Sequence, residues 1–393
     1  MSRTGVDVGA VIDASDVVVC CGSGGVGKTT TAAVVALEAA RRGRRAVVVT
    51  IDPARRLADA FGLAGGLSAE PQRIDLPAVR AGRSAAGDGH PDDRTDDGEL
   101  WAMMLDTAAT FDGLVRAHAD DADQVERILS NPFYRNMAGA MSGTQEYMAA
   151  ETLHALHADG RFDLVVVDTP PSRNALDFLD APGVLSRFLD HKIFRLAMLP
   201  TRNGLKFMGV AAQPVFKAIG KVVGSDVLSD ALAFFQAFAG MESGFRERAD
   251  EVIELLRAER TSFVVVASPR HDTITEAVWF ARQLRDQGVG VSAAIVNRLQ
   301  PEFGLPIPAP QATACGGSDP TDEDVSEDPV LATLTANLAE LRSIRDAELA
   351  ALAPLVELTE PAPVALVPLL DADVHDLDAL DEIAGHLFRP TAT

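Results

Sequence analysis

The stretch that decides the fold runs from Val17 to Thr31 and reads Val-Val-Val-Cys-Cys-Gly-Ser-Gly-Gly-Val-Gly-Lys-Thr-Thr-Thr. An apolar run comes first, a glycine loop follows, and a helical pattern begins at the end of the loop. The spacing G-x-x-x-x-G-K-[ST] is met by Gly22, Gly27, Lys28 and Thr29. Glycines at these positions let backbone N–H groups turn inward around phosphate oxygens. The stretch therefore predicts a strand, a phosphate-binding loop and the start of a helix.

The residue types in this loop suit a nucleoside triphosphate with its magnesium ion. Lys28 would neutralise the β and γ phosphates, and the Thr29 hydroxyl would ligate Mg²⁺, which prefers hard oxygen ligands. The helix that starts at Lys28 adds the positive end of its dipole. We expect ATP to be contacted by Gly22, Ser23, Gly24, Gly25, Val26, Gly27, Lys28, Thr29 and Thr30.

The same glycines also satisfy a second pattern. Gly22, Gly24 and Gly27 fit G-x-G-x-x-G, the fingerprint of dinucleotide-binding folds, which is a weak signal on its own. A dinucleotide fold has no use for a lysine and a hydroxyl directly after the last glycine. Lys28 and Thr29 therefore favour a triphosphate over a dinucleotide.

Length and net charge limit the classes of function. The chain has 393 residues, which suggests one large domain with an attached subdomain. Its net charge of −22 would repel a phosphate backbone, so we expect no nucleic-acid partner. Solubility alone is a sufficient explanation of that charge.

Neither the N-terminal sequence nor the cysteines indicate export. Residues 1–16 lack a basic region followed by an apolar one, and no apolar stretch reaches the roughly 20 residues of a membrane span. Cys20 and Cys21 lie in an apolar run, Cys315 lies in a polar one, and no CxxC is present for zinc or an iron–sulfur cluster. We expect a cytoplasmic protein without stable membrane insertion.

Short apolar runs alternate with helical patterns along most of the chain. These runs are Val17–Cys21, Ala46–Ile51, Leu100–Leu105, Leu164–Val167, Phe263–Ala267, Ala293–Val296 and Val364–Val367. Most are continuously apolar, as strands covered on both faces are. The pattern predicts an α/β fold of the P-loop NTPase type, with a mostly parallel sheet flanked by helices and an inserted helical subdomain.

Composition divides the chain into three parts. The first part of the ATPase core is 1–183, the helical subdomain is 184–256, and the second part of the core is 257–393. Segments 82–98 and 306–329 are rich in Gly, Pro and charged residues, and we expect flexible surface insertions there.

The helical subdomain carries an apolar stripe at helical spacing. Its members are Ala231, Phe234, Phe238, Met241 and Phe245. Met and Phe suit a groove for an apolar client helix. The same spacing is more often that of a buried core face, so the sequence favours a core and keeps the groove as an alternative.

Three segments, in this order, resemble the ArsA/GET family of deviant Walker ATPases, which includes the arsenical-pump ATPase and the tail-anchored-protein targeting factor. The first is the loop at 22–30. The second, Thr50-Ile-Asp-Pro-Ala-Arg-Arg-Leu-Ala-Asp-Ala-Phe61, is similar to switch I, and the third, Val165-Val-Val-Asp-Thr-Pro-Pro-Ser-Arg-Asn-Ala-Leu176, is similar to switch II. Weaker matches lie at 100–106, 143–146, 295–299 and 364–370. The likeness spans nearly the whole chain and is nearest to ArsA/GET-like ATPases of actinobacteria.

This resemblance implies roles for residues outside the loop. Asp52 would be catalytic beside Lys28, because it would orient or deprotonate the attacking water. Asp168 would hold Mg²⁺, through a water molecule. Asn297 would read the amino edge of adenine while Pro368, Leu369 and Leu370 pack on the ring. Without the resemblance, both aspartates could instead cap turns before nearby prolines, and Asn297 could be an ordinary strand-end residue.

Two departures from the family pattern stand out. The family usually carries a second lysine at the position of Ser23, and that lysine reaches across a dimer to the partner's nucleotide. This chain cannot make that contact. In switch II, Arg173-Asn174 stands where relatives often have Gly-His.

The motifs together predict an enzyme that binds and hydrolyses MgATP and acts as a nucleotide-driven dimeric switch. We expect a homodimer, or a mixed dimer with a paralogue that carries the missing lysine, and a protein client on the helical subdomain. Two alternatives remain. One is a non-catalytic or weakly active nucleotide-binding subunit of a mixed complex. The other is a targeting factor for apolar client helices.

Overall fold

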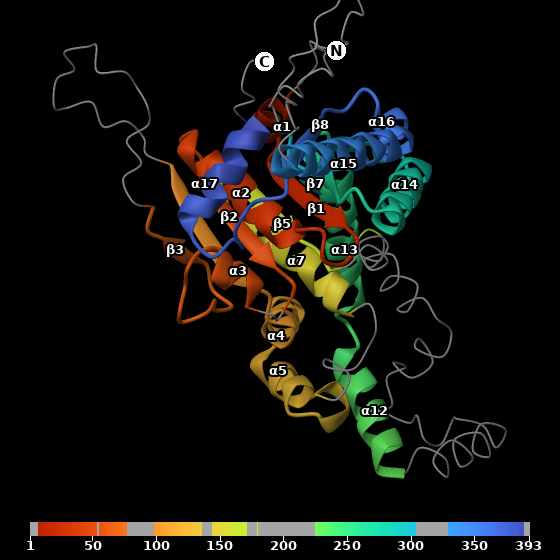
Figure 1. Ribbon diagram of the computed structural model, residues 1–393. Coiled ribbons are helices and arrows are strands. Elements are labelled where there is room, and N and C mark those ends of the chain that lie inside the picture. The colour runs from red at the N-terminus through yellow and green to blue at the C-terminus, as the bar shows by residue number, and fades with distance from the viewer. Residues whose placement is uncertain are drawn as a thin grey trace, which may run out of the picture.

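A computed structural model describes residues 7–52, 55–76, 98–135, 144–170, 179, 225–303 and 329–388. Its centre is an eight-stranded sheet of order β3-β4-β2-β5-β1-β6-β7-β8 (Figure 1). The strands are β1 (Val17–Gly22), β2 (Arg45–Thr50), β3 (Gln72–Ile74), β4 (Glu99–Met104), β5 (Leu164–Asp168), β6 (Thr261–Ala267), β7 (Val291–Leu299) and β8 (Val364–Pro368). All neighbours pair in parallel except β3, which is antiparallel to β4.

All seven predicted apolar runs form strands, and the predicted mostly parallel sheet is confirmed. Continuous apolar runs are what a sheet buried on both faces requires. The prediction missed β3, which has three residues and only one buried position, too few for a periodic signal.

Helices cover both faces of the sheet (Figure 1). They are α1 (Val8–Ala14), α2 (Lys28–Arg41), α3 (Arg56–Ala60), α4 (Thr107–His118), α5 (Ala122–Leu129), α7 (Thr144–Asp159), α12 (Ser225–Phe238), α13 (Glu242–Arg257), α14 (His271–Asp286), α15 (Pro329–Ala351), α16 (Ala353–Thr359) and α17 (Leu377–Phe388). Val17 and Val19 pack toward side chains of α4, α7, α13 and α14, whereas Val18 and Cys20 pack toward α1, α2 and α17. Successive residues of β1 therefore fill two different cores.

The apolar stripe of the helical subdomain is part of the core where it is described. Phe234, Phe238, Met241 and Phe245 on and between α12 and α13 are all at most 4% exposed. Phe111 of α4 lies 6.3 Å from Phe245 between ring centres. Of the two readings, the groove is wrong for these four residues, and the core is right. The upstream part of the subdomain lies outside the described residues.

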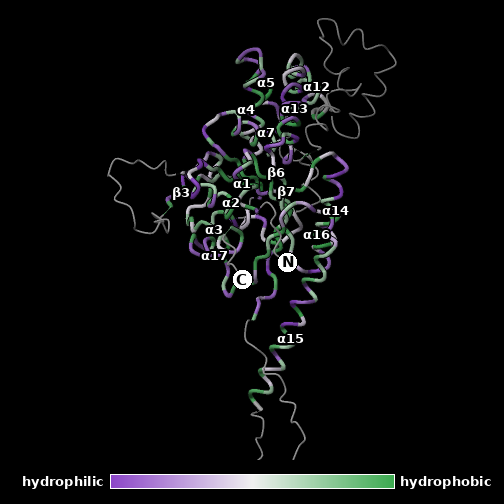
Figure 2. Tube along the Cα trace, turned by 90° about the horizontal axis from the view of Figure 1, so that it is seen from above, coloured by the Kyte–Doolittle hydropathy of each residue, from purple (hydrophilic) through white to green (hydrophobic). Residues whose placement is uncertain are grey.

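The predicted domain divisions at 183/184 and 256/257 stay predictions. The insertions expected at 82–98 and 306–329 also lie outside the described residues, apart from Gly98 and Pro329. Pro329 begins α15, which projects beyond the rest of the described chain in Figure 2. No described helix is both long enough and apolar enough to span a bilayer.

Candidate functional site

The glycine loop connects the end of β1 to the start of α2 and leaves no space for larger residues at two positions. Gly22 has φ 153°, and a β-carbon there would lie 2.1 Å from the carbonyl oxygen of Val266. Gly27 has φ 94° and is the N-cap of α2, with no side chain capping the first amides. Uncapped amides at a helix N-terminus are a binding site for anions.

Lys28 is folded back onto the loop. Its side chain is buried, and Nζ donates a hydrogen bond to the carbonyl of Ser23 at 2.8 Å. Burial lowers the pKa of Lys28, while the charge of Asp168 opposes that shift. An ammonium group held in a partly desolvated loop gains from an anion beside it, which is what a polyphosphate supplies.

Asp168 ends β5 and links the phosphate loop to β2. Its Oδ2 accepts hydrogen bonds from the hydroxyls of Thr29 at 2.7 Å and Thr50 at 2.9 Å. Burial raises the pKa of this carboxyl, while the two hydroxyls act in the opposite direction. Its Oδ1 is buried and has no hydrogen-bond partner among the described residues.

This arrangement fits a magnesium ion. A buried carboxylate with one unpartnered oxygen lies directly beside a threonine hydroxyl, and Mg²⁺ prefers such hard oxygen donors. Thr29 would hold the ion directly, and Asp168 would hold it through water; these two roles stay predictions.

Asp52 lies just beyond β2, beside the same cluster. Its backbone N–H donates to Thr50 Oγ1 at 3.2 Å, and its Oδ2 lies 3.1 Å from Nη1 of Arg56. Gln145 of α7 donates to the carbonyl of Ile51 at 3.0 Å. Asp52 is therefore held at the phosphate side of the sheet, next to a cation.

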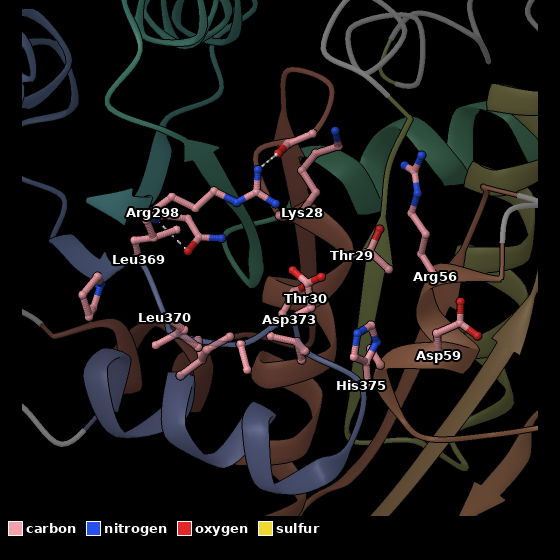
Figure 3. Close-up of a pocket in the computed structure, with 18 residues that line it drawn as sticks. Lys28, Thr29, Thr30, Arg56, Asp59, Arg298, Leu369, Leu370, Asp373 and His375 are labelled. Carbon is pink, nitrogen blue, oxygen red and sulfur yellow. Dashed lines mark hydrogen bonds between the residues drawn. The ribbon is translucent and has the colours of Figure 1, made fainter. Parts of the chain in front are cut away.

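A cavity of about 500 Å³ opens next to the loop (Figure 3). Its phosphate side is formed by Gly25, Gly27, Lys28, Thr29 and Thr30. The cavity is also lined by Asn297 at the end of β7, whose side chain contacts the loop, and by Pro368, Leu369 and Leu370 at and just beyond the end of β8. Residues predicted from three distant segments thus meet around one space at the carboxyl edge of the parallel strands, where α/β folds bind ligands.

Asn297 has spare hydrogen-bonding capacity on the side chain. Its Nδ2 donates to the carbonyl of Val26 at 3.2 Å, and its Oδ1 accepts from the backbone N–H of Arg298 at 2.9 Å. An amide offers two donors and two acceptor lone pairs, so one of each remains. That remainder matches the N6 donor and N7 acceptor of adenine.

Some predicted nucleotide contacts do not line this cavity. Gly22, Ser23, Gly24 and Val26 belong to the loop but not to the cavity wall, and the Ser23 hydroxyl is buried without a described partner. Asp52 and Asp168 do not line the cavity themselves. Asp52 pairs with Arg56, and Asp168 accepts a hydrogen bond from Thr29; Arg56 and Thr29 both line the cavity.

Sequence reasoning missed part of the wall. The lining also includes Arg298, Asp373 and His375. Arg298 follows Asn297 directly, and the polar run 371–376 follows the last apolar strand, so both lie next to residues that were predicted. Their position in the sequence, next to residues already predicted, was the only feature that could have indicated them.

Sheet, loop and aspartate cluster together define a P-loop NTPase. The family model for anion-transporting ATPases (ArsA) matches residues 15–305, and the chain belongs to this family. The ArsA/GET resemblance is thereby confirmed.

Individual relatives are distant. ATPase GET3 of Malassezia globosa is 26% identical over 270 residues, which cover 68% of this chain and 67% of the relative. ATPase GET3C of Arabidopsis thaliana is 27% identical over 269 residues, covering 67% and 61%. An ATPase ASNA1 homolog of Entamoeba dispar is 24% identical over 261 residues, covering 66% and 68%. The chain spans about two thirds of these relatives, and the likeness to actinobacterial members stays a prediction.

Proposed function

We propose that this chain binds MgATP and hydrolyses it, and that hydrolysis drives a switch within a dimer. The observation that carries the proposal is the joint placement of Lys28, the Thr29–Asp168 pair and Asp52. These groups come from the ends of β1, β5 and β2, which are neighbours in the sheet. Membership of an ATPase family supports the same activity.

The residues present account for the parts that phosphoryl transfer needs. Lys28 exchanges the Ser23 carbonyl for β- and γ-phosphate oxygens, and the amides of the loop and of α2 bind the remaining charge. Mg²⁺ neutralises charge on the phosphates when it is bound. Asp52 holds the attacking water: the new bond forms from water oxygen to the γ-phosphorus, the bond to the β,γ-bridging oxygen breaks, and Asp52 accepts the proton.

The dimeric part of the proposal depends on Ser23. Members of the family usually have a lysine there that reaches the partner's nucleotide, and Ser23 is instead buried within its own loop. A trans cation is worth about 10³–10⁵ in rate where analogous arginine fingers act. We therefore favour a mixed dimer in which a paralogue supplies the lysine.

A homodimer would need a different cation. Arg56 is a candidate, because it lines the cavity, pairs with Asp52 and is 67% exposed. Arg55 is its neighbour at the N-cap of α3, and Arg173 lies outside the described residues.

The second candidate function is a weakly active nucleotide-binding subunit, and the buried Ser23 is the observation that favours it. A targeting factor for apolar client helices receives no support from the described stripe, since its side chains are in the core.

Phosphate release by the purified protein tests the proposal. Asp52→Asn should leave the affinity for ATP near that of wild type and lower kcat by about 100-fold or more, because an amide cannot accept the proton. Asp106→Asn is the matched control. Asp106 follows β4, which neighbours β2, but it caps α4, and asparagine caps helices equally well.

Three outcomes separate the candidates. Turnover by wild type that is lost in Asp52→Asn and kept in Asp106→Asn supports hydrolysis. ATP binding with turnover only after a lysine-bearing paralogue is added supports the mixed dimer. Equal turnover in wild type and Asp52→Asn would remove Asp52 from the reaction.

A further inference from the structure

Arg298, at the carboxyl end of β7, has an unusual backbone conformation. Its φ is +63°, and it is the one non-glycine residue with positive φ in the described part of the chain. A side chain with a β-carbon is strained in this region, which is populated mainly by Gly, Asn and Asp. Strained residues of this kind cluster at functional sites, and Arg298 lines the candidate nucleotide cavity.

The strain places the guanidinium on the phosphate loop. Nη1 of Arg298 donates to the carbonyl of Gly25 at 3.0 Å, and Figure 3 shows the side chain extending from β7 to the loop. The preceding residue, Asn297, donates to the next carbonyl, that of Val26. Two successive residues of β7 thus hold two successive carbonyls of the loop.

Holding these carbonyls also orients loop amides. Each peptide unit is planar and trans, so a carbonyl fixed outward forces the N–H of the following residue to point the opposite way. The Gly25 carbonyl shares its plane with the N–H of Val26, and the Val26 carbonyl shares its plane with the N–H of Gly27. Gly25 and Gly27, with φ of 75° and 94°, would otherwise leave this part of the loop free to rotate.

We propose that Arg298 is a positioning residue that pre-orders the phosphate loop for nucleotide through the Gly25 carbonyl. Glycine would adopt the backbone conformation at position 298 without strain. An arginine is strained there, and its guanidinium contact with the loop explains why an arginine occupies the position. The proposal rests on the proposed nucleotide binding. It predicts that the side chain matters for the loop and not for the stability of the fold.

Arg298→Gly and Arg298→Asn test this directly, because both tolerate positive φ and neither keeps the guanidinium. MgADP binding, measured by calorimetry, should weaken roughly 5- to 20-fold in both, since one charged hydrogen bond that orders the loop is lost. The midpoint of thermal unfolding should not fall below the wild-type value, because both substitutions suit the backbone conformation at position 298. Arg270→Ala is the control, since Arg270 is an exposed arginine that pairs with Asp272 at the start of α14.

Amide hydrogen exchange without nucleotide supplies a second, independent measurement. Peptides covering 22–28 should exchange faster in Arg298→Gly and Arg298→Asn than in wild type and Arg270→Ala. Wild-type affinity and exchange in both variants would overturn the proposal, as would a loss of affinity that merely follows a fall in the unfolding midpoint. If the wild-type protein binds no nucleotide, the proposed function is wrong, and the proposed positioning role of Arg298 is wrong as well.

Discussion

The phosphate side and the base side of the candidate nucleotide site differ in how deeply their side chains are buried. On the phosphate side, Lys28 is 8% exposed and Asp168 is 1% exposed, and both are hydrogen-bonded to neighbouring elements. On the base side, Leu369 is 51% exposed, and Asp373 and His375 are exposed too. Buried charged groups interact strongly with a ligand charge, whereas an exposed wall offers little beyond contact area. Phosphates should therefore provide most of the affinity, and the base side should provide selectivity.

Lys28→Ala should have the largest effect on binding. Truncating one partner of a buried, hydrogen-bonded charge pair costs about 2–5 kcal/mol, so ATP affinity should fall by about 30-fold or more. Calorimetric titration with MgATP measures this loss, and Lys28→Gln, which keeps the length and removes the charge, should behave similarly. Equal affinity of Lys28→Ala and wild type would remove the phosphate site from the loop.

Asp168→Asn should affect magnesium more than nucleotide. Partners that hold a metal through water typically contribute about 10- to 100-fold in metal affinity, so half-maximal turnover should need that much more Mg²⁺. The control is Asp163→Asn, an exposed carboxylate just before the same strand, which pairs with Arg45. A magnesium titration of Asp168→Asn that matches that of Asp163→Asn would exclude Asp168 from the metal site.

Asn297→Ala tests whether the base side of the site selects adenine. Its spare donor and acceptor match adenine, and a good amide–adenine pair is worth about 1–3 kcal/mol of discrimination, so the preference for ATP over GTP should fall by roughly 5- to 150-fold. The ratio of the two dissociation constants is the appropriate measurement, because Asn297 also holds Val26 and Arg298, and a loop disturbance affects both nucleotides alike. An unchanged ratio would show that Asn297 only supports the loop.

The sequence predicted those parts of the fold and the site in which many residues follow one regular pattern. The glycine loop has a fixed spacing, and seven apolar runs, most of them continuous, each form a strand because both faces of a parallel sheet are buried. Asn297 was expected at the nucleotide site from the family resemblance alone, and the end of its strand lies at the same edge of the sheet as the loop.

Features that depend on single contacts could not be predicted in this way. The strained backbone of Arg298 depends on the carbonyl opposite it, and no local pattern records that carbonyl. β3 is too short to show a period. The Phe234–Phe245 stripe has the same spacing whether it lines a groove or a core, and only the packing of α4 and α5 against it decides the matter.

Leu369→Ala should have the smallest effect and is the strictest test of the contrast between the two halves. Half of this side chain is already exposed, so removing its apolar atoms should cost about 0.5–1 kcal/mol, or two- to fivefold in affinity for ATP. The loss should be the same for GTP, because an aliphatic contact reads no base edge. The hydrogen bond from the backbone N–H of Leu369 to the Leu299 carbonyl survives the substitution, so the loop should stay in place. Leu366→Ala is the matched control, since Leu366 is a leucine of β8, the strand that Leu369 directly follows, and it is 37% exposed and lies outside the cavity. Competition titrations against a fluorescent nucleotide resolve such small differences. A loss in Leu369→Ala as large as that in Lys28→Ala would show that the base side carries the affinity, and the comparison of the two halves would be wrong.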